Sequence, residues 1–388
     1  MSYPLKKIGE LEAEGAASIQ TGPFGTQLKA SDYSPEGVPV INVRNIGYGD
    51  LRPEKLEFVP EATAERLGVH VLTEQDIVFG RKGAVDRHLF VANGQSGWVQ
   101  GSDCIRLRLS SKEINPRFVS YAFLSSRHKD WMLQQCGNKA TMASLNQDVI
   151  RRIELRLPHL GTQDEIVSIL SAYDDLIENN RRRMALLEEA ARLLYSEWFV
   201  HFRFPGHEHV KMIDGLPEGW ERRTLGDLMT LKRGYDLPEA RRLQGDIPIV
   251  SSSGITGYHN AHKVIGPGIV TGRYGTLGQV FLIYRNFWPL NTSLYVRDMK
   301  GHYTSYLLHL LRHCLPSAQS DKAAVPGLDR NTLHTIKIVV PPPLLRCQFD
   351  EFASANLRQT KLLTDANEKL IKVRDLLLPR LINGDIAV

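Results

Sequence analysis

The feature that most constrains the fold of this 388-residue chain is an internal repeat. The segment DIVFGRKGAVDRHLFV at Asp76–Val91 aligns without a gap with GIVTGRYGTLGQVFLI at Gly268–Ile283. Both segments contain Gly-Arg-x-Gly, at Gly80–Gly83 and at Gly272–Gly275. A repeat about half the chain apart is far too long for a solenoid. It predicts two copies of one domain in a single chain.

The duplication extends well beyond this pair of segments. Three further pairs follow the same order in both halves: KKIGEL (6–11) with RTLGDL (223–228), GVPVINV (37–43) with DIPIVSS (246–252), and SLNQDVIRRIELRLP (144–158) with GLDRNTLHTIKIVVP (327–341). The repeated unit therefore includes the segment that leads into the tail of each half.

Each half is predicted to end in a long helix with a heptad seam. The first tail has no proline or glycine from Gln163 to Arg203, and its apolar positions alternate steps of four and three residues, with Asn180 filling one place. The predicted first seam is Ile166, Leu170, Tyr173, Ile177, Asn180, Met184, Leu187, Ala191, Leu194 and Trp198. The predicted second seam is Phe349, Phe352, Asn356, Gln359, Leu363, Ala366, Leu370, Val373 and Leu377, with Pro379 expected to end the helix.

Two such seams in one chain most simply pack against each other as an antiparallel coiled coil. A helix of about 33 residues is about 50 Å long, which would hold two globular units apart. The alternative is that each helix packs only on its own domain. Short strand-like runs alternate with helical stretches, which predicts mixed α/β or α+β globular units. The expected divisions are 1–157 (first globular domain), 158–203 (first helix), 204–342 (second globular domain) and 343–388 (second helix).

Composition excludes several classes of protein. Four cysteines stand far apart and form no CxxC pair, so we expect neither a disulfide framework nor a zinc site, and a reducing cytoplasm fits best. No apolar run approaches the roughly 20 residues that a bilayer requires, so no membrane association is expected. The net charge of +5 is compatible with nucleic-acid binding without proving it.

Motifs for catalysis are missing from the sequence. The glycines around Gly266–Gly268 do not have the GxGxxG spacing, and no GK[ST] follows them. An amino-methyltransferase NPPY or DPPY motif, a GxSxG motif and a metal-ligand spacing are likewise absent. The chain is therefore predicted to bind a partner, with no cofactor or metal of its own.

The arginines on the repeated turns, Arg81 and Arg273, make DNA a suitable partner. A planar guanidinium beside glycines can approach a guanine edge or a phosphate closely. Alternatively, each arginine is a hairpin residue that pairs a local carboxylate, and the serines near 251 are plain loop. The other candidates follow predicted strands or turns: Gln20, Thr21, Lys29, Arg44, Asn45, Lys82, Arg87 and Lys139 in the first half, and Lys232, Arg233, Ser251, Ser252, Tyr258, His259, Asn260 and Tyr274 in the second.

Three segments resemble a known family. They are GPFGTQLKASDYSPEGVPVINVRNI (22–46), LPHLGTQDEIVSILSAYDDLIENNRRRMALLEEAARLLYSEWF (157–199) and LLLPRLINGDI (376–386). Together with the duplicated layout, they resemble the specificity (S) subunits of type I restriction–modification enzymes.

The resemblance implies a non-catalytic, cytoplasmic protein in which each globular unit is a target recognition domain for one half of a split double-stranded DNA site. The helices would form the antiparallel coiled-coil spacer between the half-sites. Two methyltransferase (M) subunits would bind S-adenosylmethionine, and motor-nuclease (R) subunits would use ATP and Mg²⁺. Recognition domains differ greatly within the family, so it assigns no base-contacting residue. The rival hypotheses are a fused enzyme and a coiled-coil scaffold that does not bind DNA.

Overall fold

The computed structural model describes residues 3–136, 144–276, 278–318 and 327–388. The chain divides into two compact units. Unit 1 comprises Met1–Ile177 and Glu368–Val388, and unit 2 comprises Glu178–Asn367. The division passes through both long helices, so each unit holds one globular domain and a stretch of each helix.

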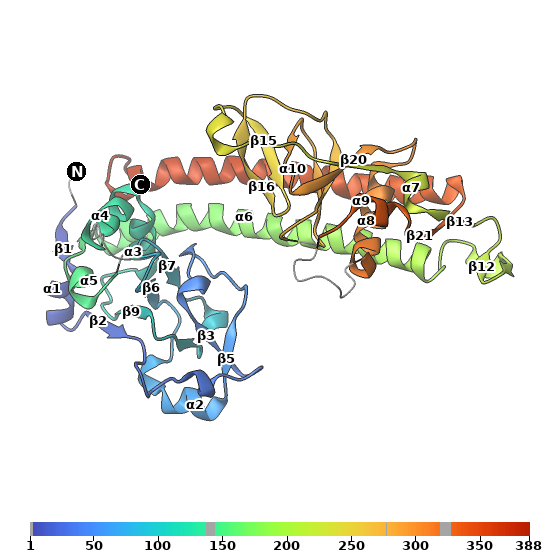
Figure 1. Ribbon diagram of the computed structural model, residues 1–388. Coiled ribbons are helices and arrows are strands. Elements are labelled where there is room, and N and C mark those ends of the chain that lie inside the picture. Colours follow the sequence, from blue (N-terminus) through green and yellow to red (C-terminus); the bar gives the residue numbers. More distant parts are fainter. Residues whose placement is uncertain (1–2, 137–143, 277, 319–326) are drawn as a thin grey trace. The chain divides into compact units, whose positions relative to one another are not determined.

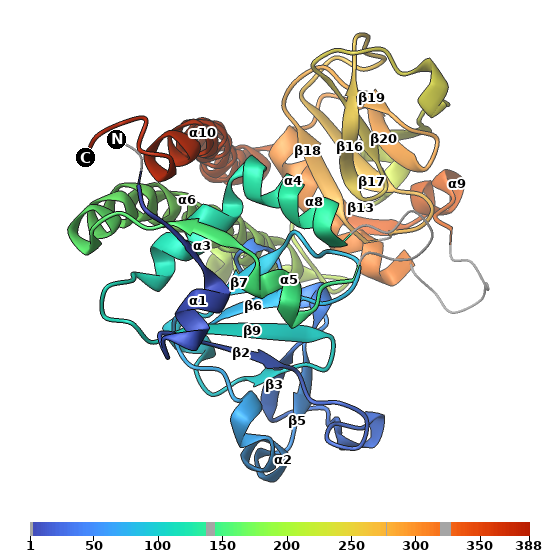
Figure 2. The same cartoon turned by 90° about the vertical axis from the view of Figure 1, so that its left-hand side faces the viewer.

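Unit 1 is built on a five-stranded sheet in the order β2 (Ala17–Thr21), β9 (Cys104–Leu109), β6 (Ile77–Gly80), β7 (His88–Phe90) and β4 (Tyr48–Gly49). Figure 2 shows β2, β9, β6 and β7 side by side. A three-stranded sheet contains β5 (Glu57–Val59), β3 (Val38–Ile41) and β8 (Val99–Gln100), and β1 (Leu5–Lys7) pairs with β10 (Glu154–Arg156). The helices are α1 (Ile8–Ala13), α2 (Glu61–Arg66), α3 (Pro116–Leu124), α4 (Ser126–Cys136) and α5 (Gln147–Arg151).

Unit 2 repeats this plan. Its larger sheet has the order β14 (Thr230–Arg233), β20 (Ser293–Asp298), β17 (Gly268–Gly272) and β18 (Val280–Ile283). Its second sheet contains β16 (Gly254–His259), β15 (Ile247–Ser251) and β19 (Trp288–Pro289), and β13 (Glu221–Thr224) pairs with β21 (Lys337–Val340). The helices are α7 (Leu225–Leu228), α8 (Thr304–Ala318) and α9 (Arg330–His334), and a hairpin of β11 (Met212–Ile213) and β12 (Leu216–Pro217) precedes them.

The register of the strands confirms the repeat residue by residue. Gly80 pairs with Cys104, and Gly272 pairs with Ser293. The next N–H donates across the sheet in both units, from Arg81 to the carbonyl of Asp103 (2.7 Å) and from Arg273 to the carbonyl of Thr292 (2.8 Å). The two Gly-Arg-x-Gly turns therefore occupy the same place in two copies of one α+β fold, as the sequence predicts.

The long helices α6 (Leu160–Tyr195) and α10 (Pro343–Ile382) pack antiparallel, with a π-helical turn at Ser196–Val200 after α6. In unit 2, Asn180 Nδ2 donates to Asn367 Oδ1 (2.8 Å), while Asn356 Nδ2 donates to the carbonyl of Leu187 (3.2 Å). As the residue number rises along α6, the number of the contacting residue on α10 falls, so the two helices are antiparallel. Figure 1 shows α6 in green beside α10 in red. The predicted coiled coil is confirmed.

The first seam is correct, and the second is partly wrong. Every position of the first seam is buried or half-buried. On α10, Leu363, Leu370 and Leu377 also face inward, but Phe352 and Val373 are 42% and 41% exposed. Their neighbours Ala353 and Arg374 take the inward places. A charge is tolerated there because Arg374 donates to Asp174 across the pair (2.7 Å).

Pro379 does not end α10. The helix continues to Ile382, and Asn383 N–H donates to the carbonyl of Pro379 (3.0 Å). Proline removes one helical hydrogen bond, which is costly. Burial of Leu378, Leu381 and Ile382 in the core of unit 1 offsets that loss.

The helix ends complete the globular cores. In unit 1, Ile166 and Leu170 of α6 join Leu378 and Leu381 of α10 in the same cluster as Phe79 of the sheet. In unit 2, the cluster combines the end of α6 and the start of α10 with the domain, through Ala191, Tyr195, Phe199, Leu345 and Phe349. The alternative of packing on a domain is therefore also true: the helices pack both on each other and on the domains.

Asp174 connects three elements of unit 1. It accepts hydrogen bonds from Tyr121 Oη of α3 (2.6 Å), Arg117 (3.2 Å) and Arg374 of α10 (2.7 Å).

We predict that Asp174→Ala lowers the free energy of unfolding by about 1–3 kcal/mol, because it leaves three largely covered donors without their acceptor. Asp175→Ala, on the exposed neighbour, should change it by less than about 0.5 kcal/mol. Urea unfolding measures both, and equal effects would contradict a specific role for the Asp174 network.

Candidate nucleic-acid interface

In each unit, several loops meet at one edge of the larger sheet. Strand β9 runs antiparallel to β2 and β6, so the ends of β2 and β6 lie beside the start of β9. Strand β20 has the same relation to β14 and β17. We call these loops edge 1 (residues 22–27, 81–87 and 101–103) and edge 2 (residues 234–238, 273–276 and 290–292).

The Gly-Arg-x-Gly turns need their glycines. Gly83 and Gly275 have φ of 75° and 82°, the left-handed region that favours glycine. A Cβ on Gly272 would lie 2.1 Å from the carbonyl oxygen of Thr276. The arginine carbonyls are also fixed: Arg81 accepts from the N–H of Leu145 (2.8 Å), and Arg273 accepts from that of Leu328 (2.9 Å). The backbone of each arginine is thus held on both sides, and its side chain extends from a rigid base.

Both arginine side chains stack on an aromatic ring. The guanidinium carbon of Arg81 lies 4.9 Å from the ring centre of Phe24, and that of Arg273 lies 4.6 Å from that of Tyr274. The rings themselves are 51% and 42% exposed. Within the described residues, neither arginine forms a salt bridge, so pairing with a local carboxylate is not what holds them. Stacking fixes the plane of a guanidinium and leaves its N–H edge to donate.

Edge 1 contains three of the nine predicted residues of the first half, Arg81, Lys82 and Arg87, and others lie beside it. Lys82 pairs with Asp103 (3.1 Å), and Arg87 lies 5.3 Å from the ring of Tyr48. Thr21, next to Gln20 at the end of β2, accepts from Gln147 (2.8 Å). Arg44 pairs with Glu57 (2.7 Å), just after Val43, which lies against Gly80. Lys29 instead precedes the short helix Ala30–Asp32, which Arg66 ties to α2, and Lys139 is outside the described residues.

Edge 2 has a different set of side chains. Lys232 Nζ lies 3.3 Å from Tyr235 Oη, and Arg233 lies 3.8 Å from Asp236. Ser251 and Ser252 are largely buried, and Ser252 supports the turn from below, next to Gly272 and Gly275. Tyr258 and Asn260 are exposed, but they lie at the far end of β15, whose first residue, Ile247, pairs with His259. Lys232, Arg233, Arg273 and Tyr274 therefore lie together, and the residues around 258 lie apart.

Two further predicted contacts, Asn45 and His259, are buried. Asn45 has no exposed surface, and its side chain donates to the carbonyls of Arg52 and Glu54. His259 is 6% exposed and accepts from the N–H of Leu243 (3.0 Å). Each side chain holds a loop in place and cannot reach a base, so the prediction is wrong for these two.

Apart from Tyr274, the aromatic residues beside the basic ones were not predicted. Besides Phe24 and Tyr48, they include Tyr235, which a hydrogen bond joins to Tyr295 (3.1 Å), and Trp288. Lys263 Nζ lies 4.9 Å from the ring of Trp288 and 5.8 Å from that of Tyr235. The hydrogen bond with Tyr295, followed by that from Lys232, lowers the pKa of Tyr235. The signal in the sequence was an aromatic residue one or two positions after a loop glycine, as in GPF and KRGY.

Other kinds of site find no support in the described residues. They contain no group of three His, Cys, Asp or Glu side chains placed to hold a metal ion. No helix in the described ranges is both long and apolar enough to cross a bilayer. What the edges share is a rigid turn whose arginine stacks on an exposed ring, an arrangement suited to the bases and phosphates of DNA.

The two-copy layout matches a known protein family. The family model described as "Type I restriction modification DNA specificity domain" matches residues 22–189 and again residues 217–344, so the chain belongs to this family. Each match covers most of one globular domain.

Curated relatives carry the same designation. The chain is 23% identical over 306 residues to the type I restriction enzyme MjaIX specificity subunit of Methanocaldococcus jannaschii, covering 70% of this chain and 69% of the relative. It is 21% identical over 387 residues to the HindI specificity subunit of Haemophilus influenzae, covering 77% and 84%. The crystal structure of the S subunit from M. genitalium superposes with a TM-score of 0.58 at 17% identity, covering 98% of this chain and 96% of that one. This likeness shows the shared fold.

The turn glycines provide a test of the edge geometry. We predict that Gly272→Ala lowers the free energy of unfolding by at least about 2 kcal/mol, because its Cβ meets a backbone oxygen at 2.1 Å. The matched Gly80→Ala should cost about 1 kcal/mol or less, because its nearest neighbour is a Val43 methyl at 3.1 Å. Thermal unfolding of both variants measures the difference. A costlier change at Gly80 would contradict the geometry of the turns.

Proposed function

We propose that this chain is the DNA sequence-recognition subunit of a type I restriction–modification complex, and that each unit reads one half of a bipartite double-stranded site. The observation that carries the proposal is the pair of equivalent turns, each presenting an arginine stacked on an exposed ring. A guanidinium held in this way can donate two hydrogen bonds to guanine O6 and N7. The neighbouring lysines and arginines supply phosphate contacts that position the protein.

The two half-sites should differ in sequence, because the shared framework carries different side chains. Lys82 follows the arginine in unit 1, whereas Tyr274 follows it in unit 2. The loop after β2 presents Phe24, and the loop after β14 presents Tyr235 and Asp236. Edges with different donors, acceptors and rings favour different bases.

In this proposal the chain contributes no catalytic group. S-adenosylmethionine, ATP and Mg²⁺ would be bound by the methyltransferase and motor-nuclease partners. A scaffold that contacts only proteins is the second candidate, favoured by the coiled coil alone. It gives no reason for two clusters of stacked cations on equivalent turns, so the DNA-reading function is preferred.

A second apolar stripe on the helix pair supports docking of the methyltransferase subunits. In unit 1, Ile169 and Leu176 of α6 are 36% and 51% exposed, and Val373 and Leu376 of α10 are 41% and 70% exposed. In the heptad these residues occupy the same flank, next to the seam, and this flank of one helix faces that of the other in an antiparallel pair. We call them helix patch 1. Helix patch 2, in unit 2, is Leu186, Leu193, Phe352 and Leu362, with exposures of 69%, 49%, 42% and 63%.

The internal repeat relates the two patches. Ile166 and Phe349 are the corresponding first seam residues of the two helices, so Ile169 corresponds to Phe352 and Leu193 to Leu376. Each patch therefore contains one member of each corresponding pair. A helical partner that covers one patch with apolar side chains can cover the other in the same way. Two copies of one methyltransferase subunit fit this arrangement.

Alanine at the turn arginines tests DNA reading. We predict that Arg81→Ala reduces discrimination at one half-site by about 1–3 kcal/mol and leaves the other unchanged, and that Arg273→Ala does the reverse. Selection from a randomised duplex library by the complex with its methyltransferase partner measures both half-sites. Arg330→Ala, on α9, is the control. Absence of any sequence-selective binding by the unmodified complex would favour the scaffold instead.

Introducing a negative charge into each helix patch tests docking. Leu376→Glu and Leu193→Glu should each remove one methyltransferase subunit from the complex, because a carboxylate would be buried in an apolar contact. Mass measurement of the assembled complex counts the subunits. Glu368→Lys, exposed on another face of α10, should leave both bound. Loss of both subunits from one substitution would contradict two separate patches.

A coordinated change in both helices tests the spacer. Inserting seven residues into α6 and seven at the opposing place in α10 keeps the seam in register and adds about 10 Å to each helix. We predict that the unread gap lengthens by about three base pairs while both half-sites stay the same. Methylation mapping gives the result, and changed half-sites with an unchanged gap would refute the spacer.

A further inference from the structure

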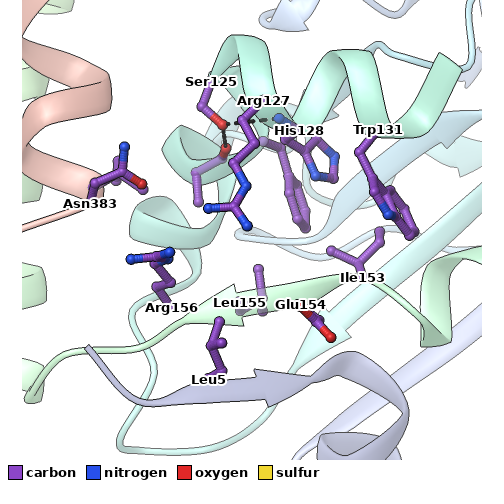
Figure 3. Close-up of a pocket in the computed structure, with 13 residues that line it drawn as sticks. Leu5, Ser125, Arg127, His128, Trp131, Ile153, Glu154, Leu155, Arg156 and Asn383 are labelled. Carbon is purple, nitrogen blue, oxygen red and sulfur yellow. Dashed lines mark hydrogen bonds between the residues drawn. The ribbon is translucent and has the colours of Figure 1, made fainter. Parts of the chain in front are cut away.

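Unit 1 has a pocket where its first strand, its last helix and α4 meet. Its walls come from β1, from α4, from β10 and from the residues that end α10 (Figure 3). The cavity has a volume of about 130 Å³, enough for one side chain. None of its lining residues belongs to edge 1.

One end of the pocket is polar and positively charged. Figure 3 shows the guanidinium groups of Arg127 and Arg156 close to the amide of Asn383. In the part of the chain that the structure describes, neither arginine forms an ion pair. The lining also includes the carboxylate of Glu154, which Figure 3 shows on the side of Ile153, away from the two guanidinium groups. Two guanidinium groups that share a recess favour an anion between them.

The other end of the pocket is apolar. Trp131, Ile153 and Leu155 lie there, and Ile153 and Leu155 are 1% and 2% exposed. His128 stacks on Phe123 at 4.6 Å, and burial lowers its pKa to about 4, so it is neutral near pH 7. The positive charge at neutral pH therefore comes from the two arginines alone.

We propose that this pocket binds the acidic end of a partner polypeptide, with a carboxylate between Arg127 and Arg156 and an apolar side chain against Trp131. A carboxylate accepts bidentate hydrogen bonds from arginine, and the apolar floor covers the neighbouring side chain. A nucleic-acid backbone fits less well, since it would bring repeated phosphates past an apolar floor and past Glu154 on the wall.

Unit 2 does not repeat this site. Ile8 N–H donates to the carbonyl of Ile153, and Leu225 N–H donates to that of Ile336, so the two strand pairs align with Ile153 on Ile336. Arg156 then corresponds to Val339, and Glu154 corresponds to Lys337. The helix patches come in two related copies, but the charges on the β10 wall of this pocket are not repeated at the corresponding positions of β21. Its partner should accordingly bind once per chain.

Fluorescence polarisation with the full chain tests the proposal. The probe is a fluorescein-labelled peptide, Gly-Ser-Gly-Glu-Leu, with a free carboxyl terminus, and the matched probe is Gly-Ser-Gly-Gln-Leu ending in a carboxamide. The acidic peptide should bind saturably, and the neutral one at least about tenfold more weakly. The double variant Arg127→Gln/Arg156→Gln should weaken the acidic peptide at least about tenfold. Arg152→Gln, exposed at the end of α5, should leave it unchanged.

Further measurements separate the possible failures. Arg156→Gln alone, with an unchanged melting temperature, should show an intermediate loss, which guards against misfolding of the double variant. Binding of the duplex target should be unchanged in all three variants, so the result does not depend on DNA reading. Equal affinity for the two peptides, no saturation up to about 1 mM, or displacement by a thymidine pentanucleotide more effective than by unlabelled peptide would overturn the proposal.

Discussion

The antiparallel contact between α6 and α10 is the interaction on which the rest of the structure depends. Neither globular domain closes its core without it. Ile166 and Leu170 enter the core of unit 1 from one helix, and Leu378 and Leu381 enter it from the other. Each fully buried side chain of this kind contributes about 1.5–3 kcal/mol. Segments some 200 residues apart in sequence are therefore needed for the same small domain, as the pairing of Asp174 with Arg374 also shows.

Polar residues within the seam give that contact its register. A seam of leucines alone could slip by a heptad at little cost, because every hole accepts the same knob. Asn180 opposite Asn367, and Asp174 opposite Arg374, have partners only in one alignment. Such residues reduce stability relative to an apolar seam, but a slipped pair would bury them without these partners. Register matters here because it decides which helix residues enter each domain core.

The parts of this fold that could be predicted from sequence are those in which a local pattern has one physical solution. The repeated Gly-Arg-x-Gly is one, because the turn excludes a Cβ at Gly272 and favours glycine at Gly83 and Gly275. The second seam failed at Val373 because an apolar residue stood beside the true seam position, and Arg374 became acceptable only through Asp174 on another helix. The prediction that α10 ends at Pro379 failed for a related reason, since burial of the last turn is a tertiary effect.

The same distinction explains which residues of the candidate site could be predicted from the sequence and which could not. Asn45 and His259 belong to residue types that contact bases, but sequence does not reveal that their hydrogen bonds are already used within loops. Phe24 and Trp288 were missed because an aromatic residue in a loop reads as core until its neighbours are known. What the fold requires at the edges is the backbone of the turn and its arginine anchor. It places no demand on the side chains around them. A duplicated frame can therefore keep its helix contacts and turns while each edge changes its rings and charges, and that freedom is what the proposed reading of two different half-sites requires.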